Sequence, residues 1–142
     1  MVSQKPVKKR YFFGLDLHAA VRHLPDTRSR TVYVISHLMG GVLLQKEIFE
    51  KYLAHQMKRM MSLDRSAKDE SGIAALIVTL IELGRQAGEI RGDLPAALAV
   101  DFFLFVFIEA AKPYYQNPEG YNQARAVDRS AELFVNGLRP VL

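Results

Sequence analysis

Cysteine is absent from this sequence, and long apolar runs are absent as well. Without a thiol, neither a disulfide framework nor a thiolate metal site can form. The longest apolar run covers residues 102–108, far short of the ~20 residues that a transmembrane helix needs. The apolar residues after the basic start are interrupted by Asp16, His18, Arg22 and His23, unlike the core of a secretory signal peptide. We therefore expect a cytoplasmic protein with no membrane partner.

The patterns of the common catalytic sites are also missing. There is no glycine-rich phosphate loop after a strand, no nucleophile elbow, and no histidine spaced from a second ligand as metal sites require. Asp101 and Glu109 are the best carboxylate pair. Their separation by two turns of an apolar helix is more typical of a solvent stripe, or of an ion pair between subunits, than of acid/base catalysis. We expect no catalytic residues, no metal, no cofactor and no enzymatic activity.

What the sequence does contain is apolar residues at helical spacing. With 49% hydrophobic residues among 142, the chain can form one domain with a substantial core. Apolar positions three and four residues apart predict an all-α, multi-helix bundle. The β-branched residues 31–35 could form a strand, but no second strand is evident to pair with it, so a helix is predicted there. The expected helices cover residues 15–24, 28–44, 46–62, 72–90, 96–112 and 118–137.

Several helix ends can be predicted from individual residues. Asp26 and Thr27 can cap the helix over 28–44, in which Gly40 and Gly41 leave a kink or break as probable as a straight course. Pro113 should end the helix that begins at residue 96.

The segment 82–95 is predicted to join two long helices. Arg91 suits the last turn of the first helix, and Gly92 suits a left-handed cap. Asp93 can cap the next helix, with Pro95 near its first turn.

The two C-terminal helices are predicted to associate with a second copy of the chain. The helix over 96–112 is apolar almost all the way round, so it must be covered on more than one side. Alanines in the stripe of the last helix allow close approach of another helix. The candidate residues for this interface are Phe103, Val106, Phe107, Ala124, Val127, Ala131 and Phe134.

A stripe of methionine and aromatic residues over 49–60 predicts either plain core or an adaptable pocket for a small apolar or amphipathic effector. Gln56, His55 and His37 would be the polar groups able to orient such a ligand. The candidate pocket residues are Met39, Phe49, Tyr52, Gln56, Met57, Met60, Ile77 and Leu80.

The stretch over 73–95, followed by an apolar helix, an NPEG turn and a last helix ending in NGLRP, resembles the C-terminal half of the TetR family of transcriptional regulators. The residues that carry the resemblance follow the family pattern G-x-x-x-G-E-[IL]-R-x-D-L and are Gly84, Gly88, Glu89, Ile90, Arg91, Asp93 and Leu94. The resemblance implies an effector-binding and dimerisation domain whose last two helices form a four-helix bundle with those of a second subunit.

The N-terminus departs from that family. Residues 2–17 are similar to the junction between a recognition helix and the helix that follows it, so the first part of a helix-turn-helix is not found. Residues 1–30 carry seven basic and two acidic side chains, a local charge of +5 that leaves −1 for the rest. Residues 1–13 are thus interpreted as the remnant of a DNA-binding unit, with Lys5, Lys8, Lys9 and Arg10 as candidate DNA contacts, and residues 14–142 as the helical domain.

Two other interpretations stay open at this point. An intact regulator with a degenerate helix-turn-helix would bind duplex DNA in a salt-sensitive way. A small helical interaction module would have no ligand cavity. In the preferred interpretation, DNA is a partner only if a helix-turn-helix lies upstream.

Overall fold

The computed structural model describes residues 11–12, 15–44, 46–47, 50–51, 54, 58 and 72–141, and the chain is an all-α, multi-helix bundle as predicted. The isolated described residues between 46 and 58 are helical. The elements are β1 (Tyr11–Phe12), β2 (Leu15–Asp16), α1 (Leu17–His23), α2 (Thr27–Leu44), α4 (Ile73–Gln86), α5 (Ala96–Gln116), the 3-10 helix η2 (Pro118–Gly120) and α6 (Gln123–Leu138).

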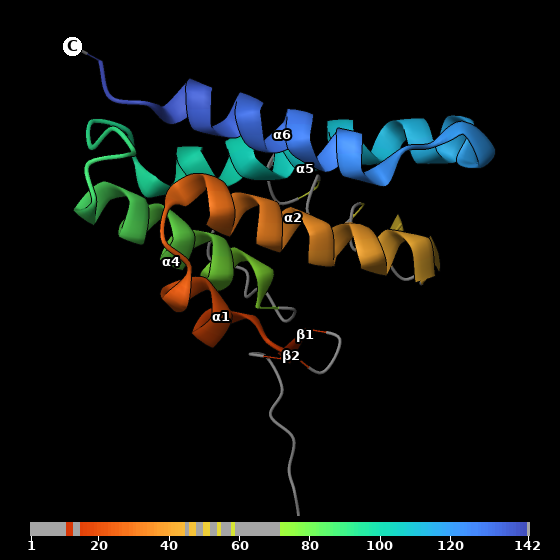
Figure 1. Ribbon diagram of the computed structural model, residues 1–142, viewed down its shortest axis with the longest axis horizontal. Coiled ribbons are helices and arrows are strands. Elements are labelled where there is room, and N and C mark those ends of the chain that lie inside the picture. Colours follow the sequence, from red (N-terminus) through yellow and green to blue (C-terminus); the bar gives the residue numbers. More distant parts are fainter. Residues whose placement is uncertain are drawn as a thin grey trace, which may run out of the picture.

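The helices α5 and α6 form a hairpin that lies along one side of the molecule (Figure 1). η2 joins them, and α6 runs back until its end reaches the segment before α5, where the Arg91 amide donates to the Leu138 carbonyl at 2.8 Å. Helices α2 and α4 lie beneath this hairpin in Figure 1, with α2 against α6 and α4 against α5. Helix α1 packs on the far side, against α4 and α2.

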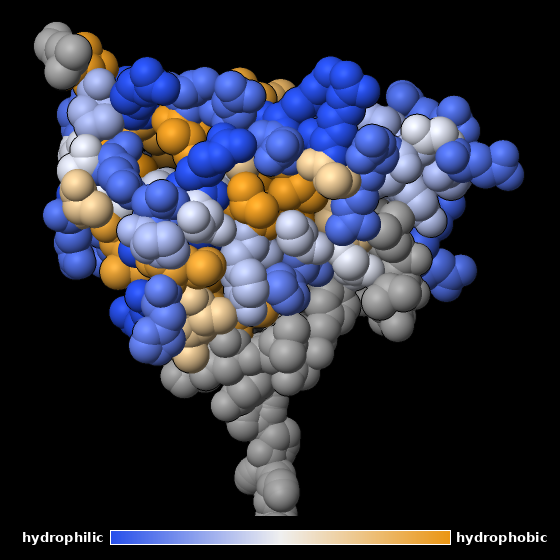
Figure 2. Space-filling model, in the orientation of Figure 1, coloured by the Kyte–Doolittle hydropathy of each residue, from blue (hydrophilic) through white to orange (hydrophobic). Residues whose placement is uncertain are grey.

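The core lies between these helices and is built from the apolar positions that recur every three or four residues. Its largest fully buried side chains are Phe103 and Phe107 of α5 and Phe134 of α6. The rings of Phe103 and Phe134 meet edge to face with centroids 5.2 Å apart, a favourable aromatic geometry. The face seen in Figure 2 is mostly hydrophilic with small apolar patches, as expected once these side chains are buried.

Helix α2 confirms that the β-branched residues 31–35 are helical. The hydroxyl of Thr31 donates to the Thr27 carbonyl at 2.8 Å, so this buried group is satisfied inside the helix. The Asp26 carboxylate accepts from the Ser29 amide at 2.8 Å, which confirms it as a cap and lowers the pKa of Asp26. α2 is continuous through Gly40 and Gly41.

Four predicted boundaries were wrong. The last helix begins at Gln123 and not at residue 118, because residues 118–120 form the separate 3-10 helix η2. The two-residue strands β1 and β2 pair antiparallel within residues 11–16, so α1 begins at Leu17. Helix α4 ends at Gln86, before Gly88. Helix α5 continues through Pro113 to Gln116. Proline lacks the amide that would donate to the preceding turn, but its carbonyl still accepts a hydrogen bond from the Asn117 amide at 2.9 Å.

The segment between α4 and α5 does not use the predicted caps. Gly88, not Gly92, takes the left-handed conformation, with φ of 77°. No side chain caps α5, whose N-cap is Pro95. Asp93 instead pairs with Arg91 at 2.7 Å, and this hydrogen bond lowers the pKa of Asp93 to about 2. Asp93 lies two residues before the N-cap position, which Pro95 occupies.

Glu89 in this segment caps α2, a helix far away in the sequence. Its carboxylate Oε1 accepts from the Thr27 amide at 2.8 Å and from the Thr27 hydroxyl at 2.6 Å. From the end of α4, Arg85 donates to the carbonyls of Arg91 and Leu94. The segment over 87–95 therefore ties together the end of α4, the start of α2 and, through Arg91, the end of α6.

Replacing Glu89 by alanine is expected to lower the free energy of unfolding by about 1–3 kcal/mol, because the buried donors of Thr27 lose their acceptor. Glu89→Gln retains an amide oxygen and should lose less. Urea unfolding of both variants followed by circular dichroism would measure the difference. Equal stability of Glu89→Ala and the wild type would contradict the assigned role.

Candidate functional site

The structure describes only some of the residues that were predicted to line the effector pocket. Met39, Ile77 and Leu80 are fully buried in the same core cluster, so the structure brings these three together. Phe49, Tyr52, Gln56, Met57 and Met60 lie outside the described residues, as does His55.

His37 is turned toward its own helix. Its Nδ1 lies 2.9 Å from the Tyr33 carbonyl, and its ring lies 4.3 Å from the Tyr33 ring. Its imidazole is therefore already engaged on α2, and the orientation of a ligand by His37 stays a prediction.

A buried polar atom near the C-terminal end of α5 was not predicted from the sequence. The hydroxyl of Tyr115 is buried and has no hydrogen-bond partner among the described residues. The Lys46 ammonium lies 5.2 Å from the centre of the Tyr115 ring, so the start of the 46–58 stretch is next to this tyrosine. Burial, with a smaller contribution from Glu50, raises the pKa of Tyr115. An unpaired buried hydroxyl is energetically costly, and its bonding is commonly completed by a water molecule, an ion or another polar group.

The residues predicted for contact between subunits are mostly inside one protomer. Only Ala124 of that set is exposed. The reason is that α5 lies between α4 and α6, so the single chain already covers most of its apolar circumference. The fold buries the following residues of that set against other parts of the same chain: Phe103, Val106, Phe107, Val127, Ala131 and Phe134.

The large apolar side chains that remain exposed on these two helices are different ones. Leu98 and Phe105 of α5 are 51% and 52% exposed, and Leu133 of α6 is 51% exposed. Leu98 and Phe105 are seven residues apart, which places them on the same side of α5. A sequence signal existed, since helical spacing places Leu98 and Phe105 on the side of α5 opposite to the core positions Phe103 and Phe107.

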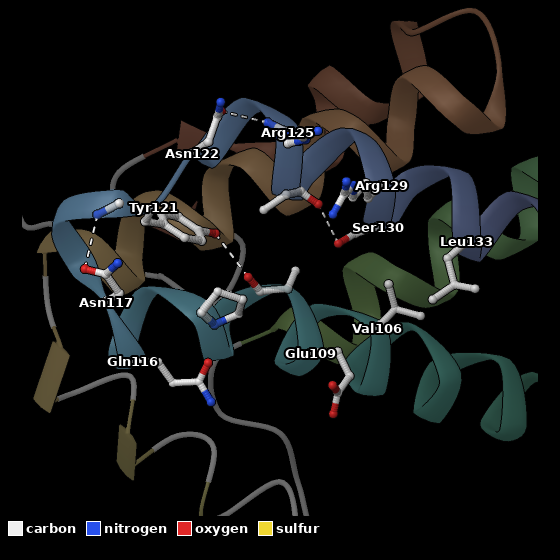
Figure 3. Close-up of a pocket in the computed structure, with 14 residues that line it drawn as sticks. Val106, Glu109, Gln116, Asn117, Tyr121, Asn122, Arg125, Arg129, Ser130 and Leu133 are labelled. Atoms are coloured by element: carbon white, nitrogen blue, oxygen red, sulfur yellow. Dashed lines mark hydrogen bonds between the residues drawn. The ribbon is translucent and has the colours of Figure 1, made fainter.

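A groove runs between α5 and α6 on the outside of the hairpin, with a volume of about 520 Å³ (Figure 3). Val106 and Leu133 lie at one end of it, and the residues around η2 lie at the other. The groove is lined by Val106, Glu109, Ala110, Pro113, Gln116, Asn117, Gly120, Tyr121, Asn122, Arg125, Ala126, Arg129, Ser130 and Leu133.

Hydrogen bonds hold the walls of this groove in place. The Tyr121 hydroxyl crosses from the start of α6 to donate to the Ala110 carbonyl of α5 at 3.1 Å (Figure 3). The side chain of Asn122 caps α6 by accepting from the Arg125 amide at 3.1 Å, and Asn117 caps η2 by accepting from the Gly120 amide at 3.3 Å. The polar end of the groove is thus preformed by capping residues.

The charges around the groove are unevenly distributed. On the α5 wall, Glu109 pairs with Lys112 at 3.2 Å. On the α6 wall, Arg125 and Arg129 are four residues apart and therefore share one side of the helix. Neither guanidinium has an ion-pair partner among the described residues. The groove is therefore positively charged along α6. Neither arginine was predicted as a site residue from the sequence. Their four-residue spacing, with Ala126 between them, was the pattern that could have indicated a shared side of the helix.

Other kinds of site are not found in the described part of the chain. It contains no cluster of three or more histidine, aspartate or glutamate side chains suited to a metal ion. None of its helices combines the length and the apolar character that crossing a bilayer requires. The candidate DNA contacts Lys5, Lys8, Lys9 and Arg10 lie outside the described residues. Comparison with protein-family models, curated proteins and solved structures gives no match for this chain.

Proposed function

We propose that this chain is the effector-binding and dimerisation domain of a TetR-like transcriptional regulator. The observation that carries the proposal is the outer face of the α5–α6 hairpin, where Leu98, Phe105 and Leu133 are each about half exposed. Large apolar side chains gathered on one face of a soluble domain commonly mark a protein contact. The resemblance of the preceding segment, from Gly84 to Leu94, to the same family supports it.

The hairpin also suits contact with an identical hairpin. In a two-fold symmetric dimer the same patch contacts itself, so one apolar face is sufficient. Two antiparallel helices from each copy then make a four-helix bundle. In this arrangement Phe105, near the middle of α5, lies close to the two-fold axis, and the arginine-lined end of the groove lies away from it.

The effector part of the proposal is supported by Tyr115. Its buried hydroxyl lacks a partner among the described residues and lies beside Lys46, where the methionine-rich stretch begins. An amphipathic effector with one hydrogen-bonding group would satisfy this hydroxyl and cover apolar side chains at the same time. Its binding would then shift α4 and α1, which pack together, and so reach a DNA-binding unit attached before α1.

Replacing both Phe105 and Leu133 by glutamate is expected to convert a dimer into a monomer of 16.1 kDa, because two charges per copy would be buried without partners. Analytical ultracentrifugation at micromolar concentration measures the mass. Circular dichroism should show an unchanged helix content, since both side chains are exposed in the single chain.

Ala75→Glu is the control, because it adds a glutamate at an exposed position on α4 and should leave the dimer intact. A wild-type protein that sediments as a monomer over the whole concentration range would disprove the proposed dimer.

A further inference from the structure

The strongest unassigned feature is the arginine-lined groove between α5 and α6. We infer that it binds the anionic group of a small amphipathic carboxylate, with Arg125 and Arg129 holding the carboxylate and the groove floor contacting the apolar chain. This inference does not rest on the effector site near Tyr115, and it assigns a second ligand site on the opposite side of α5. It does not require the proposed dimer, although Leu133 belongs both to the groove lining and to the proposed dimer face.

The size and floor of the groove fit such a ligand. A volume of about 520 Å³ is in the range of small-molecule pockets, which commonly hold about 300–1,000 Å³. The floor is made of small apolar side chains, Ala110 and Ala126, and continues between Val106 and Leu133 (Figure 3). A straight alkyl chain would lie along this floor in contact with both helices.

The charges select an anion over a cation. Glu109 is the acidic residue of the lining, and its carboxylate forms an ion pair with the Lys112 ammonium at 3.2 Å. Asp128 of α6 pairs with Arg28 of α2 at 3.4 Å, on the side of the helix away from the groove. Arg125 and Arg129 therefore contribute the net charge of the lining, and guanidinium groups bind carboxylates through two parallel hydrogen bonds.

The polar end of the groove offers further donors. The side-chain oxygens of Asn117 and Asn122 are engaged by the amides of Gly120 and Arg125. The amide NH₂ group of each asparagine is the end that can donate to a ligand oxygen. Because these residues cap η2 and α6, their positions are fixed before any ligand binds, which lowers the entropic cost of binding.

Isothermal titration calorimetry with octanoate and dodecanoate tests this inference. Both should bind with one site per chain, and dodecanoate more tightly because it buries more apolar surface. The double variant Arg125→Gln/Arg129→Gln should weaken binding at least tenfold, since each lost charge-assisted hydrogen bond is substantial. Arg139→Gln, an exposed arginine just after α6, is the matched control and should bind like the wild type.

Three results would overturn the inference. The first is equal affinity of the wild type for 1-octanol and octanoate. The second is unchanged affinity of the double arginine variant for the two carboxylates. The third is a wild type that binds neither carboxylate, together with a double arginine variant that no longer forms the dimer. The last would assign the groove to a second copy of the chain. Phe105 does not line the groove, so dodecanoate binding to Phe105→Glu would support the inference even if the proposed regulator function fails, and the two are tested separately.

Discussion

Phe103→Ala is expected to lower the free energy of unfolding by about 3–5 kcal/mol, the usual cost of removing a buried phenylalanine. Phe103 has no exposed surface, and its ring meets Phe134 edge to face at 5.2 Å. The cavity would open where α5 and α6 pack, in the middle of the bundle. Since a domain of this kind is stabilised by about 5–15 kcal/mol in total, the loss should be visible as a large fall in the urea midpoint.

Phe105→Ala provides a control on the same helix with the same chemical change. Its side chain is 52% exposed on the outer face, so its removal leaves no internal cavity. We expect a loss below about 1 kcal/mol, as for surface substitutions in general. Losses of similar size for the two variants would mean that α5 is oriented differently from the structure described.

The difference between these two phenylalanines explains what could be predicted from the sequence. The spacing of apolar residues predicted α1, α2, α4, α5 and α6, with errors at several of their ends, and identified Phe103 and Phe134 as residues that must be covered. It could not determine what covers them, because α5 is apolar on nearly every side and periodicity alone does not distinguish a neighbouring helix from a second subunit. The tertiary arrangement buries Phe103 and leaves Phe105 half exposed.

The groove and its arginines illustrate a different limit. Arg125 and Arg129 were recognisable as neighbours on one side of α6, but the α5 residues opposite them depend on how the hairpin closes. The contact of Tyr121 with the Ala110 carbonyl sets that closure, and it joins residues eleven apart across a turn. Such a pairing depends on tertiary structure, whereas the cap at Asp26 depends on three neighbouring residues and was predicted correctly.

The segment over 82–95 was correctly predicted to join two helices, but its residues have other roles than the predicted ones. Its glycines and charges were interpreted as local caps for the two adjoining helices. In the structure Glu89 caps α2 instead, and Gly84 is buried where α4 passes Thr27 and Ile90. The pattern G-x-x-x-G-E-I thus brings together a glycine that leaves room for the Ile90 side chain and the Thr27 hydroxyl, and a carboxylate that accepts a hydrogen bond from that hydroxyl.

Gly84→Ala is therefore expected to destabilise the protein by about 1–3 kcal/mol, the usual cost of adding a methyl group to a packed interior. A Cβ atom at this position would lie 2.5 Å from the Ile90 side chain and 2.7 Å from the Thr27 hydroxyl, so the contact between Thr27 and Glu89 must shift. Glu89→Ala combined with Gly84→Ala should cost less than the sum of the single changes, since both disturb one contact.

Gly40→Ala is the matched control, and its expected effect has the opposite sign. Gly40 lies inside α2, and a Cβ there would meet nothing within 4 Å. Alanine is favoured over glycine in a helix, and it also restricts the unfolded chain, so a gain of about 0.4–1 kcal/mol is expected. Urea unfolding of the two variants side by side measures both signs. A stabilising Gly84→Ala would show that α4 and the 87–95 segment do not pack as closely as described, because helix propensity alone would then decide both positions.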